Sequence, residues 1–182
     1  MERLEVRLSG AGGQGMILGG IILAEASTYH PELNVVQTQS YGPESRGGAS
    51  RAEVVFSREG IDYPKVVKAD ILVSLTDEAL QKYGSDVKKD SIVIIDEKLD
   101  TEEFTPPENG QFYELPIFAT ARDEIGMELT ANMVSLGAVS QFLPDLEEES
   151  IKNAINSRVP EGTEDKNLAA FTAGRKLITD YS

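Results

Sequence analysis

A glycine-rich turn near the start of the chain lies between a strand-like segment and an apolar, helix-like segment. Residues 4–8 alternate in polarity with a period of two, which predicts a strand. Residues 14–28 are rich in Ile, Leu and Ala and are predicted to form a helix, and residues 34–39 a second strand. This order predicts a βαβ unit of an α/β fold with its two strands parallel.

The rest of the chain predicts more strands and then a helical final third. Strands are expected at 51–57, 69–75, 91–95 and 111–115, and a short helix is expected between Thr76 and Gly84. Further helices are expected at 119–125, 131–143, 148–159 and 164–181. We therefore expect one α/β domain spanning residues 1–182, a three-layer sandwich with a mostly parallel central sheet of five or six strands.

Two of the predicted helices raise the question of what they pack against. The helix at 131–143 is apolar almost all round, so it is expected to be buried inside the domain or against a partner. The last helix places Leu168, Phe171, Leu177, Ile178 and Tyr181 roughly on one face. That face is consistent with packing on its own sheet and also with an interface arm.

The turn itself has the G-x-G-x-x-G spacing of phosphate-binding loops, in Gly10-Ala11-Gly12-Gly13-Gln14-Gly15. A helix N-terminus offers free N–H groups and a partial positive charge, and glycines let a pyrophosphate approach the backbone. These six residues are therefore candidate ligand-binding residues. The alternative is that the glycines serve only a tight strand-to-helix turn.

A nicotinamide site needs one further feature, an acidic residue at the end of the second strand to bind ribose hydroxyls. Here that strand ends in Gln37-Thr38-Gln39-Ser40, and Glu32 precedes it and would lie at the wrong edge of the sheet. No basic residue replaces the acid, as an NADP site would require. The loop is thus expected to hold a phosphate-bearing group without the usual ribose contact. A stand-alone dinucleotide-binding oxidoreductase remains the rival interpretation.

A second loop, at residues 40–48, is expected at the same edge of the sheet because parallel strands end together. It contributes the candidate residues Ser40, Arg46, Gly47 and Gly48. An Arg beside two glycines can make a bidentate contact to phosphate or carboxylate. The alternative is that Arg46 pairs with Glu44 or another carboxylate.

Composition excludes several classes of function. The formal net charge of -14 disfavours binding to nucleic acid and to anionic membrane surfaces. The chain has no Cys and one His, so thiolate nucleophiles, Cys-ligated iron–sulfur clusters and a His-cluster zinc site are excluded. His30 is interpreted as a residue of a helix-end turn. Any redox centres are therefore expected on other chains.

The charged, alternating first residues do not resemble a signal peptide, and the apolar stretch at 16–26 is too short to span a bilayer. A soluble, cytoplasmic protein is expected.

The two loops together resemble the gamma subunit of the 2-oxoacid:ferredoxin oxidoreductases, most closely the 2-oxoglutarate (KorC-type) branch. The specific part is Ser40-Tyr41-Gly42-Pro43-Glu44-Ser45-Arg46-Gly47-Gly48-Ala49-Ser50, and GAGGQG alone is a weak signal. Further similarities are Ile61-Asp62-Tyr63-Pro64, the stretch at 131–138 and Lys166-Asn167-Leu168. The resemblance covers nearly the whole chain, and it implies a fold like domain III of pyruvate:ferredoxin oxidoreductase.

The resemblance implies a non-catalytic subunit of an enzyme that converts a 2-oxoacid and coenzyme A to acyl-CoA and CO₂, passing electrons to ferredoxin. It places thiamine diphosphate, Mg²⁺ and the iron–sulfur clusters on alpha, beta and, where present, ferredoxin-like delta subunits. The chain has no GDG…N thiamine motif, in agreement with this division. In single-chain relatives the corresponding domain contributes to coenzyme A binding, so Gly10–Gly15 would face the coenzyme A phosphates. The isolated chain is expected to be inactive.

Two questions stay open from the sequence. The substrate could be 2-oxoglutarate, pyruvate or a branched-chain oxoacid, because substrate selection in this family lies largely outside this subunit. The chain could also be a pure assembly protein whose glycines bind nothing.

Ferredoxins are usually acidic, like this chain, so ferredoxin is expected to dock on a cluster-bearing subunit.

Overall fold

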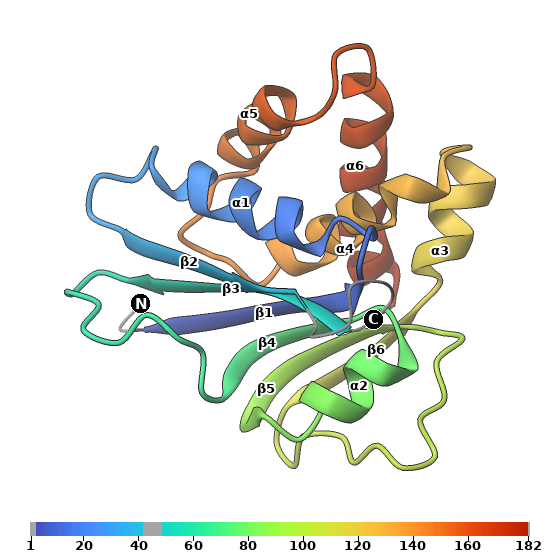
Figure 1. Ribbon diagram of the computed structural model, residues 1–182. Coiled ribbons are helices and arrows are strands. Elements are labelled where there is room, and N and C mark those ends of the chain that lie inside the picture. Colours follow the sequence, from blue (N-terminus) through green and yellow to red (C-terminus); the bar gives the residue numbers. More distant parts are fainter. Residues whose placement is uncertain (1–2, 42–48, 182) are drawn as a thin grey trace.

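A computed structural model of the chain describes residues 3–41 and 49–181, which form a six-stranded mixed sheet with helices on both faces (Figure 1). The strand order is β2-β3-β1-β4-β5-β6. β1 is parallel to β4, β4 to β5 and β5 to β6, whereas β3 is antiparallel to both β1 and β2. The strands are β1 (Leu4–Ala11), β2 (Asn34–Ser40), β3 (Ala49–Ser57), β4 (Ala69–Ser74), β5 (Val87–Asp96) and β6 (Gln111–Leu115).

The helices are divided unequally between the two faces. Four of them cover one face: α1 (Met16–Ser27), α4 (Ala131–Ser140), α5 (Glu148–Arg158) and α6 (Glu164–Asp180) (Figure 1). The other face carries α2 (Asp77–Tyr83) and the loop that follows β5. Between β6 and α4 lie three short turns, α3 (Ile117–Ala119), the π-helical η1 (Thr120–Glu124) and the 3₁₀ turn η2 (Glu128–Thr130).

Strand alternation divides the core into two clusters. In β4, Ile71 and Val73 face the four-helix side, and Leu72 between them faces α2. The larger cluster contains α4, in which all ten residues are buried. The apolar helix predicted at 131–143 is therefore buried inside the domain.

Glycines let the helices approach closely. A Cβ at Gly20 of α1 would lie 2.7 Å from the Cβ of Ala52 on β3. A Cβ at Gly137 of α4 would lie 2.0 Å from the carbonyl oxygen of Phe171, and one at Gly174 of α6 would lie 1.9 Å from that of Val134. The backbones of α4 and α6 thus touch, so the last helix packs within its own domain.

The predicted fold class is confirmed, and one part of the predicted topology needs correction. β2 does run in the same direction as β1, because both are antiparallel to β3. The two strands are not neighbours, however, since β3 is inserted between them. The pairing of Ala11 with Ala49 explains this, because the chain returns after the second loop directly alongside β1.

Several predicted boundaries also shift. α1 begins at Met16 instead of residue 14, and β3 begins at Ala49 instead of residue 51. β5 begins at Val87, four residues before the predicted start, because Val87 pairs with Ala69. The helix predicted at 131–143 ends at Ser140, and the one at 119–125 is a short α-helical segment followed by a π-helical turn.

Candidate functional site

The glycine loop connects the end of β1 to α1, and its own Gln14 holds its shape. The Gln14 N–H donates to the carbonyl oxygen of Ala11 at 3.2 Å, and the Ala11 N–H donates to Oε1 of Gln14 at 2.7 Å. A Cβ at Gly10 would lie 2.4 Å from that oxygen, so the side chain can fold back only over a glycine. Two hydrogen bonds between Ala11 and Gln14 therefore stabilise the first half of the loop as a turn, and α1 begins only after Gln14, at Met16.

The tip of the loop leaves its backbone open. At Gly12 and Gly13 no heavy atom of the described residues, apart from the chain neighbours of each glycine, lies within 4 Å of where a Cβ would be, and both residues are exposed. Gly13 has a φ of 89°, a conformation that L side chains rarely adopt. A ligand can therefore approach the main chain here without meeting a side chain.

The N-terminus of α1 suits an anion. Its N-cap is Gly15, in a left-handed conformation with a φ of 75°, and this residue has no side chain with which to cap the helix. The first turn contains no acidic residue, although the chain as a whole is strongly acidic. The free N–H groups and the positive end of the helix dipole are thus available to a phosphate.

Asn132, on the first turn of α4, contacts this loop from beneath. Its Nδ2 donates to the carbonyl oxygen of Gly15 at 3.2 Å, and its Oδ1 accepts from the N–H of Met133 at 2.9 Å. Sequence reasoning did not single out Asn132, because it lies 117 residues from Gly15 in the chain.

A small cavity of about 130 Å³ adjoins the loop, lined by Gly13, Gln14, Phe118, Glu128, Leu129 and Ala131. The side chain of Leu129 is unusually exposed for an apolar residue, at 80%. The sequence gives only a weak indication that Leu129 belongs to the site, because a single Leu in a polar turn is common. The cavity extends the open tip of the loop toward α4.

The second loop begins and ends at the same edge of the sheet as the first, as predicted, but only its end lies beside the first loop. Ser40 ends β2 opposite Arg51, and Ala49 begins β3 opposite Ala11. The Ser50 hydroxyl oxygen lies 3.2 Å from both the Gly10 and the Ala11 carbonyl oxygens and donates to them. Ser40 is two strands from β1, about 10 Å across the sheet. Arg46, Gly47 and Gly48 lie outside the described residues.

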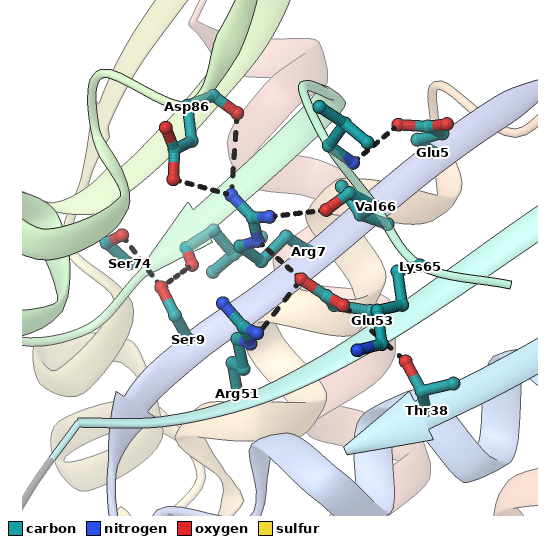
Figure 2. Close-up of polar contacts among 12 residues, drawn as sticks. Glu5, Arg7, Ser9, Thr38, Arg51, Glu53, Lys65, Val66, Ser74 and Asp86 are labelled. Carbon is teal, nitrogen blue, oxygen red and sulfur yellow. Dashed lines mark hydrogen bonds and ion pairs between the residues drawn. The ribbon is translucent and has the colours of Figure 1, made fainter. Parts of the chain in front are cut away.

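A cluster of charged residues on β1 and β3 lies on the α2 side of the sheet (Figure 2). Arg7 donates to Glu53 at 2.9 Å and to the carbonyl oxygen of Val66 at 3.0 Å. Arg51 lies 3.5 Å from Glu53 and stacks over the ring of Tyr83, with 5.3 Å between its guanidinium carbon and the ring centroid. Arg51 is thereby held in place in β3, three residues after the second loop.

The geometry does not support a nicotinamide site. The strand that would carry the ribose-binding acid is separated from β1 by β3, and it ends in Gln39 and Ser40. Glu32 pairs with Arg58, which follows the end of β3 at the opposite edge of the sheet. Neither residue at the end of β2 can therefore supply the acidic contact to ribose.

A larger cavity of about 400 Å³ lies between α2 and the loop after β5. Its lining includes Asp100, Glu102 and Glu103, which would repel a phosphate. With three carboxylates against the single Glu128 of the cavity beside the glycine loop, this larger cavity is the less suited of the two to an anion.

Residues 3–41 and 49–181 contain no cluster of three or more His, Cys, Asp or Glu side chains arranged to hold a metal ion. Within the same ranges, no helix has the length and apolar character that crossing a bilayer requires.

The fold and the two loops at one edge of the sheet define the class of protein. The chain belongs to the pyruvate ferredoxin/flavodoxin oxidoreductase family, whose sequence pattern matches residues 5–177. It is 48% identical to the 2-oxoglutarate synthase subunit KorC of Methanocaldococcus jannaschii over 178 residues, which cover 98% of this chain and 95% of that subunit.

Solved structures agree. The gamma subunit of a keto/oxoacid ferredoxin oxidoreductase from Geobacter sulfurreducens has a TM-score of 0.84 and 40% identity, covering 97% of this chain and 99% of that one. The 2-oxoglutarate:ferredoxin oxidoreductase of Magnetococcus marinus, with 2-oxoglutarate, coenzyme A and succinyl-CoA bound, has a TM-score of 0.83 and 25% identity. That match covers all of this chain and 32% of the other. The resemblance drawn from the sequence is confirmed.

Proposed function

We propose that this chain is the gamma subunit of a 2-oxoglutarate:ferredoxin oxidoreductase, and that its glycine loop binds phosphate groups of coenzyme A. The observation that carries the proposal is the open backbone at Gly12 and Gly13 next to the uncapped N-terminus of α1. The 48% identity to a KorC subunit supports 2-oxoglutarate as the substrate of the assembled enzyme.

Coenzyme A matches this loop chemically. It carries a pyrophosphate and a ribose phosphate, which free N–H groups and a helix dipole can bind without an acidic ribose contact. A helix-dipole contact of this kind contributes about 0.3–1 kcal/mol when exposed and up to ~2 kcal/mol when partly buried. The loop would therefore position the coenzyme, and other subunits would supply the remaining affinity.

The second loop completes the proposed site. Ser40 and Ala49 mark its two ends at the same edge of the sheet as the glycine loop. In the proposal Arg46 contributes a guanidinium to the phosphates, and Gly47 and Gly48 allow close approach.

Catalysis is assigned to partner subunits in this proposal. The chain has no Cys for iron–sulfur clusters and no thiamine-type motif, so thiamine diphosphate, Mg²⁺ and the clusters belong to alpha, beta and, where present, delta subunits. We propose that the assembled enzyme works in the cytoplasm, where a chain without disulfides is stable.

The test compares the isolated chain with the complex that is purified after co-expression of this chain with its proposed partner subunits. Reduction of a dye acceptor is measured with coenzyme A and 2-oxoglutarate, pyruvate or a branched-chain oxoacid. We expect turnover by the complex, fastest with 2-oxoglutarate, and none by the isolated chain. Turnover by the isolated chain, or stoichiometric binding of NAD(P) or flavin to it, would refute the subunit role. A preference of the complex for another oxoacid would refute the substrate assignment.

A further inference from the structure

Asn132 joins the glycine loop to α4, a fully buried helix of the helical layer. It is 5% exposed and lies in α4, all of whose residues are buried. α4 is in turn fixed against α6 by the two close backbone approaches at Gly137 and Gly174. A side chain anchored in such a helix has little freedom to move.

The contact with Gly15 is close enough to specify both residues. A Cβ at Gly15 would lie 2.3 Å from Nδ2 of Asn132, so a larger residue and the Asn132 amide cannot occupy this space together. The φ of 75° at Gly15 independently favours glycine. Gly15 therefore serves the turn and also makes room for Asn132.

The Asn132 hydrogen bond fixes the orientation of one peptide unit. The Gly15 carbonyl oxygen accepts from the Asn132 amide at 3.2 Å and from the N–H of Gly19 at 3.0 Å. Because a peptide unit is planar and trans, holding this carbonyl also fixes the direction of the Met16 N–H. That N–H is among the first donors of α1, which lack partners within the helix.

We propose that Asn132 is a positioning residue for coenzyme A, which acts by holding the Gly15–Met16 peptide so that the α1 N-terminus is preorganised for phosphate. This inference rests on the proposed coenzyme A role of the loop. The residue touches the loop and not the reacting atoms, so its loss weakens coenzyme A use and leaves the chemical step intact.

Asn167 supplies a matched control. It is also a buried Asn near the start of a helix, 8% exposed, and its Nδ2 donates to the backbone oxygen of Thr163 at 2.9 Å. It lies in α6 and has no hydrogen bond to the glycine loop within the described chain. Asn167→Ala therefore reproduces the loss of a buried amide without disturbing the loop.

The experiment measures KM for coenzyme A and kcat in assembled complexes carrying Asn132→Ala, Asn167→Ala or Gly12→Ala. We expect Asn132→Ala to raise KM for coenzyme A roughly three- to tenfold, the equivalent of one lost hydrogen bond, with kcat nearly unchanged. Asn167→Ala is expected to leave KM for coenzyme A unchanged. It should lower the melting temperature about as much as Asn132→Ala does. If Asn132→Ala does not assemble, Asn132→Ser takes its place. The Ser side chain is polar, like that of Asn, but is too short to reach the carbonyl oxygen of Gly15.

An unchanged KM for Asn132→Ala or Asn132→Ser, beside a raised KM for Gly12→Ala, would overturn the positioning role and leave the coenzyme A site standing. An unchanged KM in the Gly12→Ala and Asn132 complexes alike would overturn both proposals. A lowered melting temperature with no change in KM would make Asn132 a structural residue only.

Discussion

The guanidinium of Arg7 on β1 donates from Nε to Oε1 of Glu53 on β3 at 2.9 Å, and both side chains are almost fully buried (Figure 2). Arg7 also donates to the carbonyl oxygen of Val66 and lies 5.3 Å from the centroid of the Tyr83 ring. This pair joins the two antiparallel central strands at the middle of β3. A buried ion pair is costly to break, because the remaining charge has no water to compensate it.

Replacing Arg7 is therefore expected to destabilise the chain strongly. We predict that Arg7→Met lowers the free energy of unfolding by about 3–5 kcal/mol, measured by urea denaturation. Arg51→Met is the matched control, since Arg51 is 31% exposed and lies 3.5 Å from the same carboxylate. It should cost no more than about 1 kcal/mol. Equal losses for the two variants would contradict a dominant role for the buried pair.

The α4–α6 crossing gives a second prediction. A Cβ at Gly137 would lie 2.0 Å from the Phe171 carbonyl oxygen, and a main-chain atom cannot rotate away as a side chain can. We predict that Gly137→Ala lowers the free energy of unfolding by about 1–3 kcal/mol or more through overpacking. Gly60→Ala, where no described atom lies within 4 Å of the added carbon, should have little effect. Thermal unfolding of both variants checks this, and a stable Gly137→Ala protein would show that the helices separate easily.

The pairing of Arg58 with Asp145 predicts a pH dependence. The hydrogen bond from Arg58 to Oδ1 of Asp145, at 2.8 Å, holds the pKa of that carboxyl below its usual range. A lowered pKa means that the ionised form stabilises the fold. This contribution is complete above the unfolded value of about 3.9 and is lost as the pH falls through the folded pKa.

In Arg58→Gln, the pKa of Asp145 should rise toward its ordinary value, as measured by NMR titration of its carboxyl carbon. The stability difference from the unmodified chain should be largest above about pH 4 and should shrink at lower pH. Lys89→Gln, which removes an exposed ion pair with Glu108, is the control and should show no such dependence. A stability difference for Arg58→Gln that is constant with pH would contradict the assignment.

Local patterns in the sequence predicted most of the elements but not their neighbours. The capped helix after Thr76 was predicted correctly because the Thr76 hydroxyl accepts from the N–H of Ala79, a contact three residues away. The insertion of β3 beside β1 depends on the pairing of Ala11 with Ala49. The periodicity of the sequence does not reveal how the chain between them turns. The extension of β5 to Val87 likewise depends on its partner Ala69.

The candidate site divides in the same way. Glycine spacing identified the loop, because the left-handed conformations at Gly13 and Gly15 require that residue type. The roles of Gly10 and Gly15 as space for Gln14 and Asn132 are set by side-chain packing in three dimensions. No spacing rule predicts a contact between residues 117 positions apart.

Gly12→Ala tests the central claim most directly, because the added methyl lies more than 4 Å from every described residue except its chain neighbours and would obstruct an approaching ligand. In the assembled enzyme we predict that KM for coenzyme A rises roughly 10- to 100-fold, as expected when charge-assisted contacts worth about 1.5–3 kcal/mol are lost. KM for the oxoacid and the melting temperature should not change, and Gly60→Ala should match the unmodified enzyme. A Gly12→Ala complex with normal KM for coenzyme A would contradict the account and leave the loop as a turn in an assembly subunit.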